Sequence, residues 1–99
     1  MSTQPHTVTH NPGASRFEAM VGTQLALCEY HRSAAVVTFT HTEVPSALEG
    51  QGIAGAMVKA ALAWSREQGL KVRPQCSYVA LYMQRHSETL DLMAPQSQS

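Results

Sequence analysis

Three glycines, Gly50, Gly52 and Gly55, stand at the start of a segment whose apolar residues repeat at helical spacing. A helix leaves its first backbone N–H groups unpaired and carries a partial positive charge at that end. Glycines let the backbone approach a ligand closely and turn those N–H groups toward phosphate oxygens. The turn therefore predicts a site for a diphosphate or a similar anion. The alternative, that the glycines only permit a tight turn, stays open on composition alone.

Cys76 and His41 are the side chains best suited to group transfer. Cys76 is expected just before a helix, whose N-terminus would lower the pKa of its thiol. Such a thiol can act as a nucleophile or as an acid, although buried cysteines are commonly inert. His41 could act as a general base or deprotonate Cys76, or it could be a structural histidine at a strand end. Alternation places His41 on one strand face with Val37, Phe39 and Glu43.

The remaining reactive side chains carry weaker signals. Tyr78 and Tyr82 are expected mainly to pack with their hydroxyls at the surface, and Cys28 to lie in the core of a strand. The other histidines are assigned to a loose leader or to solvated turns: His6, His10, His31 and His86. Without a tight Cys/His cluster, no metal site is expected.

The elements that would position these residues follow from changes in hydrophobic period. Alternating and β-branched residues predict three strands joined by short turns, the last one long, with a bulge or a break, and ended by Pro45. The polar run His31–Ser33 is interpreted as a turn, and Gly69 as the residue that closes the main helix. The predicted elements are strands at 17–22, 25–30 and 35–44, a helix from 53, an extended segment at 70–74, a helix at 77–84 and a last turn at 87–93.

Length and charge limit the possible classes of protein. Ninety-nine residues, 43% of them hydrophobic, fit one small α+β domain. Polar composition predicts a disordered leader at 1–15 and a disordered tail at 94–99, leaving 16–93 as the domain. Seven basic and seven acidic residues cancel, so the net charge does not attract nucleic acid or an anionic membrane surface. Lacking a secretory signal and a membrane span, the chain is expected in the cytoplasm with both cysteines reduced, as a monomer or weak dimer.

The run from Gly50 to Gly55 matches the dinucleotide fingerprint G-x-G-x-x-G, and its context tests that interpretation. The fingerprint needs a strand that runs directly into the first glycine, but residues 45–49 intervene. It also expects a carboxylate at the end of the next strand, where this chain has Lys71 and Arg73. The context therefore argues against a dinucleotide cofactor.

The segment Glu49–Ala54 resembles the signature of the GNAT acetyltransferases, Gln/Arg-x-x-Gly-x-Gly/Ala. Gly52 and Ala54 fill the two small-residue positions, and Glu49 stands where the superfamily usually has Gln or Arg. The blocks His41–Pro45, the glycine turn and Pro74–Val79 occur in the order and spacing of the small, single-domain YjdJ-like branch of that superfamily. The resemblance extends from about residue 16 to residue 92.

This resemblance implies a compact GNAT-like mixed sheet in the order β-β-β(-β)-α-β-α, with two splayed strands that form a CoA cleft. It implies an N-acetyltransferase that moves acetyl from acetyl-CoA to an unidentified amine, with Cys76 and His41 at the thioester. The residues it assigns to CoA are Thr42, Glu43, Val44, Glu49, Gly50, Gln51, Gly52, Ile53, Ala54 and Gly55. A non-catalytic CoA-binding or protein-interaction module is the alternative. A small nucleic-acid binder would need charge and interleaved aromatic residues that are missing here.

Overall fold

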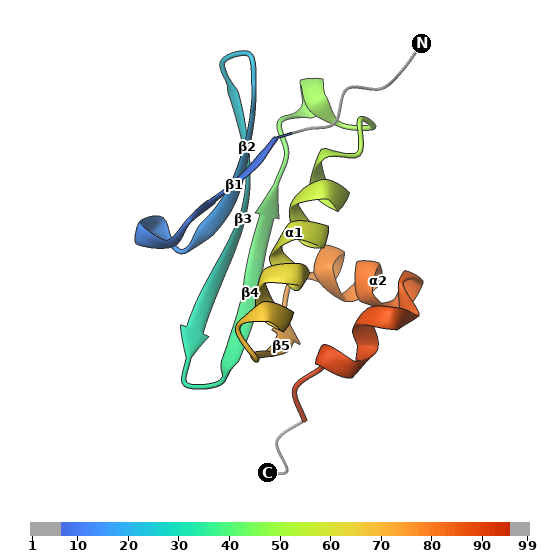
Figure 1. Cartoon of the computed structure of the whole chain (residues 1–99). Coiled ribbons are helices and arrows are strands. Elements are labelled where there is room, and N and C mark those ends of the chain that lie inside the picture. The colour runs from blue at the N-terminus through green and yellow to red at the C-terminus, as the bar shows by residue number, and fades with distance from the viewer. Residues whose placement is uncertain (1–6, 96–99) are drawn as a thin grey trace.

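The computed structural model describes residues 7–95 and contains one five-stranded sheet (Figure 1). The strands lie across the sheet in the same order as in the chain. The pairs β1–β2, β2–β3 and β3–β4 are antiparallel, and the last pair, β4–β5, is parallel. This arrangement confirms the predicted α+β class and the mixed sheet. The strands are β1 (Val8–Asn11), β2 (Arg16–Val21), β3 (Gln24–Ser33), β4 (Val36–Glu43) and β5 (Lys71–Pro74).

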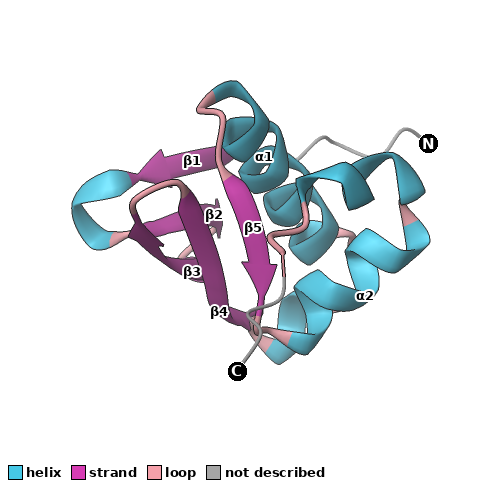
Figure 2. Cartoon of the chain, turned by 90° about the horizontal axis from the view of Figure 1, so that it is seen from below, coloured by secondary structure: helices cyan, strands magenta, loops and turns pink. Residues whose placement is uncertain are grey.

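The helices cover one face of the sheet (Figure 2). The parallel pair requires a crossover between β4 and β5, and this crossover contains α1 (Ile53–Glu67). After β5 the chain continues into α2 (Ser77–Arg85) and a 3₁₀ helix (Ser87–Leu92). Shorter 3₁₀ helices occur at Pro12–Ala14 and Ser46–Leu48.

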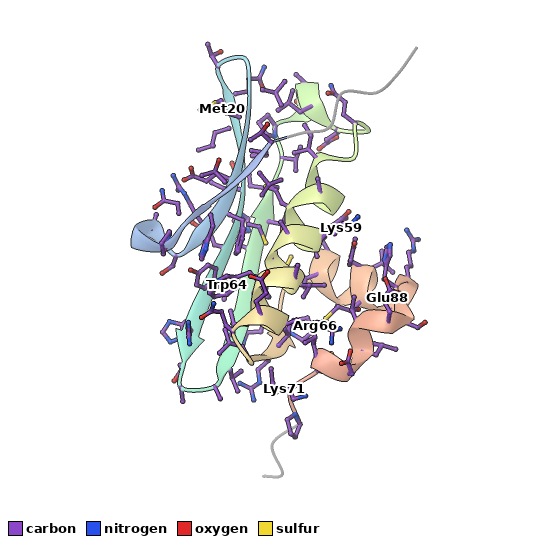
Figure 3. All side chains as sticks on the ribbon, in the orientation of Figure 1. Met20, Lys59, Trp64, Arg66, Lys71 and Glu88 are labelled. Atoms are coloured by element: carbon purple, nitrogen blue, oxygen red, sulfur yellow. The ribbon has the colours of Figure 1, made fainter. Side chains whose placement is uncertain are left out.

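The core lies between α1 and the inner face of the sheet. The buried residues of α1 form one face of the helix: Ile53, Met57, Val58, Ala61, Leu62 and Ser65. Ser65 is polar but satisfied, because its hydroxyl donates to the carbonyl of Ala61 at 2.9 Å. Figure 3 shows Trp64 on the side of α1 that faces the sheet and Arg66 on the side toward the last helices. Arg66 there makes a two-pronged ion pair with Asp91, at 2.8 and 2.9 Å.

The N-terminal segment differs from the expected disordered leader. Val8–Asn11 forms β1 and pairs with β2 from Asn11↔Arg16 to Val8↔Ala19. The turn between them is closed by Ser15, which has a left-handed φ of 55°. His10 faces the core, where its ring stacks on Phe17 at 4.2 Å and its Nε2 lies 2.7 Å from the Tyr30 hydroxyl. His6 lies outside the described residues.

Two further boundaries differ from the prediction, the end of β3 and the start of the C-terminal tail. His31–Ser33 continues β3 instead of turning, and the turn falls at Ala34 and Ala35, with Ala34 at a φ of 55°. At the other end, Ala94 was assigned to the tail, but it is buried and its N–H donates to the Val72 carbonyl at 2.8 Å. The chain after the last helix therefore packs along β5.

Candidate functional site

The glycine turn enters α1 in a conformation that favours glycine. Gly50 and Gly52 have φ values of 84° and 77°, and Gly52 is the residue that caps the helix. A Cβ added at either position would meet nothing within 4 Å, so the backbone angle and not crowding excludes a side chain. Gly55 lies inside the helix, where an added Cβ would be 3.6 Å from the Tyr78 hydroxyl. The turn therefore presents open backbone at the start of the helix.

A pocket of about 370 Å³ lies against this turn. Most of the residues assigned to CoA line it, whereas Thr42, Glu43 and Gln51 do not. Leu48 and Tyr78 also line it and were not predicted. The lining residues are Val44, Leu48, Glu49, Gly50, Gly52, Ile53, Ala54, Gly55 and Tyr78.

Strands β4 and β5 separate next to this pocket. Their parallel pairing runs from Val36↔Lys71 to Phe39↔Pro74, and the N–H of Cys76 then donates to the Phe39 carbonyl at 2.9 Å. Beyond that bond the chain turns into α2, while β4 continues to Glu43 along β3. No further backbone hydrogen bond joins β4 to the segment after Cys76 within the described range.

A bulge in β4 decides which side chains face this opening. Glu29 pairs with His41 and Tyr30 pairs with Phe39, so Thr40 is an extra residue in β4. Strict alternation would keep His41 on the face of Phe39, and that expectation is wrong, because the extra residue reverses the faces that follow. Thr42 instead pairs with buried Cys28 and faces inward.

His41 and Glu43 consequently lie on the outer face of the sheet. His41 Nε2 is 3.2 Å from Glu43 Oε1, and the two side chains are 54% and 65% exposed. This contact is between these two outer residues and does not include Cys76. The register places the His41 side chain on the face opposite the Thr42 side chain, so the hypothesis of a His41–Cys76 dyad gains no support from the geometry.

Cys76 instead contacts Thr42. The Cys76 thiol donates to Thr42 Oγ1 at 3.4 Å, and the Thr42 hydroxyl donates to Cys28 Sγ at 3.7 Å. Cys76 is the residue that precedes the first turn of α2, and it is partly buried. Sequence reasoning missed this role of the Thr42 side chain, since the position of the bulge was not evident from the residues.

Two opposing influences act on the Cys76 thiol. Burial, the largest one, raises its pKa. The Thr42 hydroxyl and three backbone N–H groups, those of Val79, Tyr78 and Thr42, lower the pKa by favouring the thiolate. The lowering influences prevail, so the Cys76 pKa is below the ordinary thiol value. Burial raises the pKa of Cys28 to about 11, although Thr42 lowers it somewhat.

Residues 7–95 contain neither a candidate metal site nor a candidate membrane span. No three histidine, cysteine, aspartate or glutamate side chains there lie close enough to hold a metal ion together. Neither α-helix in the same range has the length and apolar character that crossing a bilayer requires.

Comparison with known proteins gives one family. A model described as GCN5-related N-acetyl-transferase matches residues 16–92. Protein NATD1 of Gallus gallus and that of Mus musculus are each 41% identical over 51 residues, which are 52% of this chain and 46% of the relative. The chain thus spans about half the length of the curated relatives it matches. A GCN5-like protein of Staphylococcus aureus, solved by NMR, has a TM-score of 0.71 at 22% identity and covers 99% of this chain and 95% of its own.

The structural likeness shows the fold, a GCN5-like mixed sheet that opens beside a glycine turn. The family model covers more than half of the chain. The chain belongs to the GCN5-related N-acetyltransferase family.

Proposed function

We propose that this protein binds acetyl-CoA with its diphosphate at the glycine turn and its thioester beside Cys76, and that it transfers the acetyl group to an amine. The observation that carries the proposal is the short path between pocket and thiol. Val44 and Tyr78 line the pocket, and Thr42 and Cys76, which are in contact, stand two residues before them. The proposal places the extended pantetheine arm between these two runs of chain, along the edge of β4 that β5 leaves unpaired.

The family membership supports acyl transfer, and the site supports a particular role for Cys76. A thiol whose pKa is lowered by surrounding donors forms its thiolate at a lower pH than an ordinary cysteine does. In a covalent route, Cys76 Sγ bonds to the acetyl carbon as the bond from that carbon to the CoA sulfur breaks. The amine then takes the acetyl group, loses its proton to solvent or to a base, and frees Cys76.

A direct route uses the same residue as an acid. The amine attacks the acetyl carbon, and Cys76 gives its proton to the departing CoA thiolate and later regains one from the amine or from water. Both routes place Cys76 at the thioester. They differ in whether an acetyl group is ever found on its sulfur.

Rapid quenching and mass spectrometry separate the routes from simple binding. The protein is mixed with acetyl-CoA, quenched in acid, and digested to locate any acetyl group. CoA release is followed by chromatography with a panel of small primary amines and lysine peptides. We expect Cys76→Ala to lower the rate about 100-fold or more, as loss of a nucleophile or an acid usually does.

His31→Ala, which changes an exposed residue of β3, is the matched control and should keep the rate. An acetyl group on Cys76 in the wild type identifies the covalent route, and turnover without it identifies the direct one. Cys76→Ala turning over at the wild-type rate would refute the role of Cys76. Binding of acetyl-CoA with no transfer to any acceptor would favour the alternative, a non-catalytic CoA-binding module.

A further inference from the structure

The Thr42 hydroxyl lies between two sulfur atoms, that of Cys28 on β3 and that of Cys76 just before α2. Its Oγ1 is 3.4 Å from Cys76 Sγ and 3.7 Å from Cys28 Sγ. Cys28 is directly opposite Thr42 in the β3–β4 register, and the bond from the Cys76 N–H to the Phe39 carbonyl fixes Cys76 on the other side. The bulge at Thr40 is what turns Thr42 toward both sulfurs.

A hydroxyl has one proton, so Thr42 can donate to one sulfur at a time. In the structure the chain of donors runs from Cys76 through Thr42 to Cys28. When Cys76 loses its proton, this direction leaves its sulfur facing a lone pair of Thr42. If the Cys28 S–H and the Thr42 O–H both rotate, the direction of the hydrogen bonds reverses. Cys28 then donates to Thr42, and Thr42 donates to the Cys76 thiolate.

We infer that Thr42 is a positioning residue that stabilises the thiolate form of Cys76, by moving its hydrogen bond from Cys28 to Cys76 when Cys76 ionises. Cys28 is suited to donate a hydrogen bond to Thr42 after Cys76 ionises, because Cys28 is fully buried and keeps its proton to high pH. Two neighbouring thiols whose environments shift their pKa values in opposite directions can have distinct roles. The importance of this relay for turnover rests on the proposed function, whereas the relay itself does not.

The titratable and charged groups on the adjoining strands face away from this cluster or have other partners. Tyr30 and Arg32 lie on the inner face of β3, where Tyr30 bonds to His10 and Arg32 lies over the ring of Trp64. Glu29 on β3, His41 and Glu43 on β4 and Arg73 on β5 lie on the outer face by register. Tyr78, on α2, has its hydroxyl beside Gly55. The Thr42 hydroxyl is therefore the side-chain group whose removal should change the ionisation of Cys76 most.

The pH dependence of Cys76 alkylation by iodoacetamide tests the inference without CoA. The rate is measured by peptide mapping in the wild type, Thr42→Val and Thr42→Ser. Thr42→Val keeps the shape but lacks the donor, so its midpoint should move to higher pH and its rate near pH 7 should fall about 5- to 30-fold. Thr42→Ser should restore the wild-type midpoint.

Thr38→Val is the matched control, because Thr38 lies on β4 but pairs on the outer face with Arg73. It should leave the midpoint unchanged. If circular dichroism shows that Thr42→Val is unfolded, Thr42→Ala carries the same prediction.

The infrared S–H band of Cys28 should also shift to lower frequency as Cys76 ionises in the wild type, and should not shift in Thr42→Val.

Superimposable alkylation profiles for the wild type and Thr42→Val would overturn the inference. So would a failure of Thr42→Ser to restore the midpoint, or an equal shift in Thr38→Val. Because alkylation needs no CoA, a shifted midpoint in a protein that transfers no acetyl group would support the relay and count against the proposed function alone.

Discussion

At the scale of single residues, the pocket at the glycine turn has one charged side chain among those that line it, and that side chain is Glu49. The diphosphate of CoA is anionic, so a carboxylate here opposes binding through like-charge repulsion. The proposed site therefore depends on backbone N–H groups at the start of α1 and not on a basic side chain. This dependence fits the open, positive-φ backbone at Gly50 and Gly52.

Glu49→Gln tests this balance of charge. Removing the carboxylate should tighten CoA binding about 2- to 5-fold at low ionic strength, and the gain should shrink as salt screens the repulsion. Titration calorimetry at two salt concentrations measures it. Glu67→Gln, an exposed change at the far end of α1, should leave affinity unchanged. Weaker binding by Glu49→Gln would mean that the carboxylate contacts the ligand favourably.

The sequence predicted the residues whose role depends on local chemistry and missed those whose role depends on a register. The glycine turn follows from residue type and from the start of a helical pattern. The Thr42 side chain does not, because one extra residue in β4 exchanges the two faces and so exchanges Thr42 with His41. The sequence analysis expected a bulge or a break in this strand, but nothing in the residues fixed its position.

At the scale of elements, β1 is the clearest difference from the expectation. Its composition is polar, which predicted disorder, yet Val8 and His10 pair with inward-facing residues of β2 while Thr9 and Asn11 pair with outward-facing ones. Histidine can fill an aromatic core position when its polar atom has a partner, and Tyr30 provides one. Two inward residues are too short a pattern to recognise in a polar segment.

His10→Ala should therefore destabilise the whole domain. The change removes the stack on Phe17, the edge contact with Trp64 at 4.8 Å and the bond to Tyr30. We expect a loss of about 1–3 kcal/mol in the free energy of unfolding, measured by urea denaturation. Thr9→Ala, on the outer face of the same strand, should cost less than about 0.5 kcal/mol. Equal, small effects would show that β1 does not pack on the sheet in solution.

At the scale of the whole molecule, the helices lie on one face of the sheet and leave the other face open (Figure 2). Only Gly22 and Thr23 join β2 to β3, so no helix is inserted between these two strands. Under the proposed function, such an open surface would admit an amine on a small molecule or on a protein, and the small amines and lysine peptides of the acceptor panel represent these two classes. Hydrophobic period predicted the order of the elements from β2 onward, whereas the separation of β4 from β5 was expected only from the resemblance to the GNAT family.

The measurement that bears most directly on the central claim is calorimetric titration of acetyl-CoA into the wild type, Gly52→Ala and Gly69→Ala. Gly52 and Gly69 have similar φ values, 77° and 69°, and an added Cβ at either meets nothing within 4 Å. Both substitutions should therefore cost a similar strain of about 1 kcal/mol. Gly69, however, follows the C-terminal end of α1, far along the helix from the pocket.

If the glycine turn holds the diphosphate, the wild type and Gly69→Ala will bind acetyl-CoA with dissociation constants within about a factor of two, and Gly52→Ala will bind about 10-fold or more weakly. Absence of heat from the wild type at high protein concentration, or equal binding by Gly52→Ala and Gly69→Ala, would contradict the account.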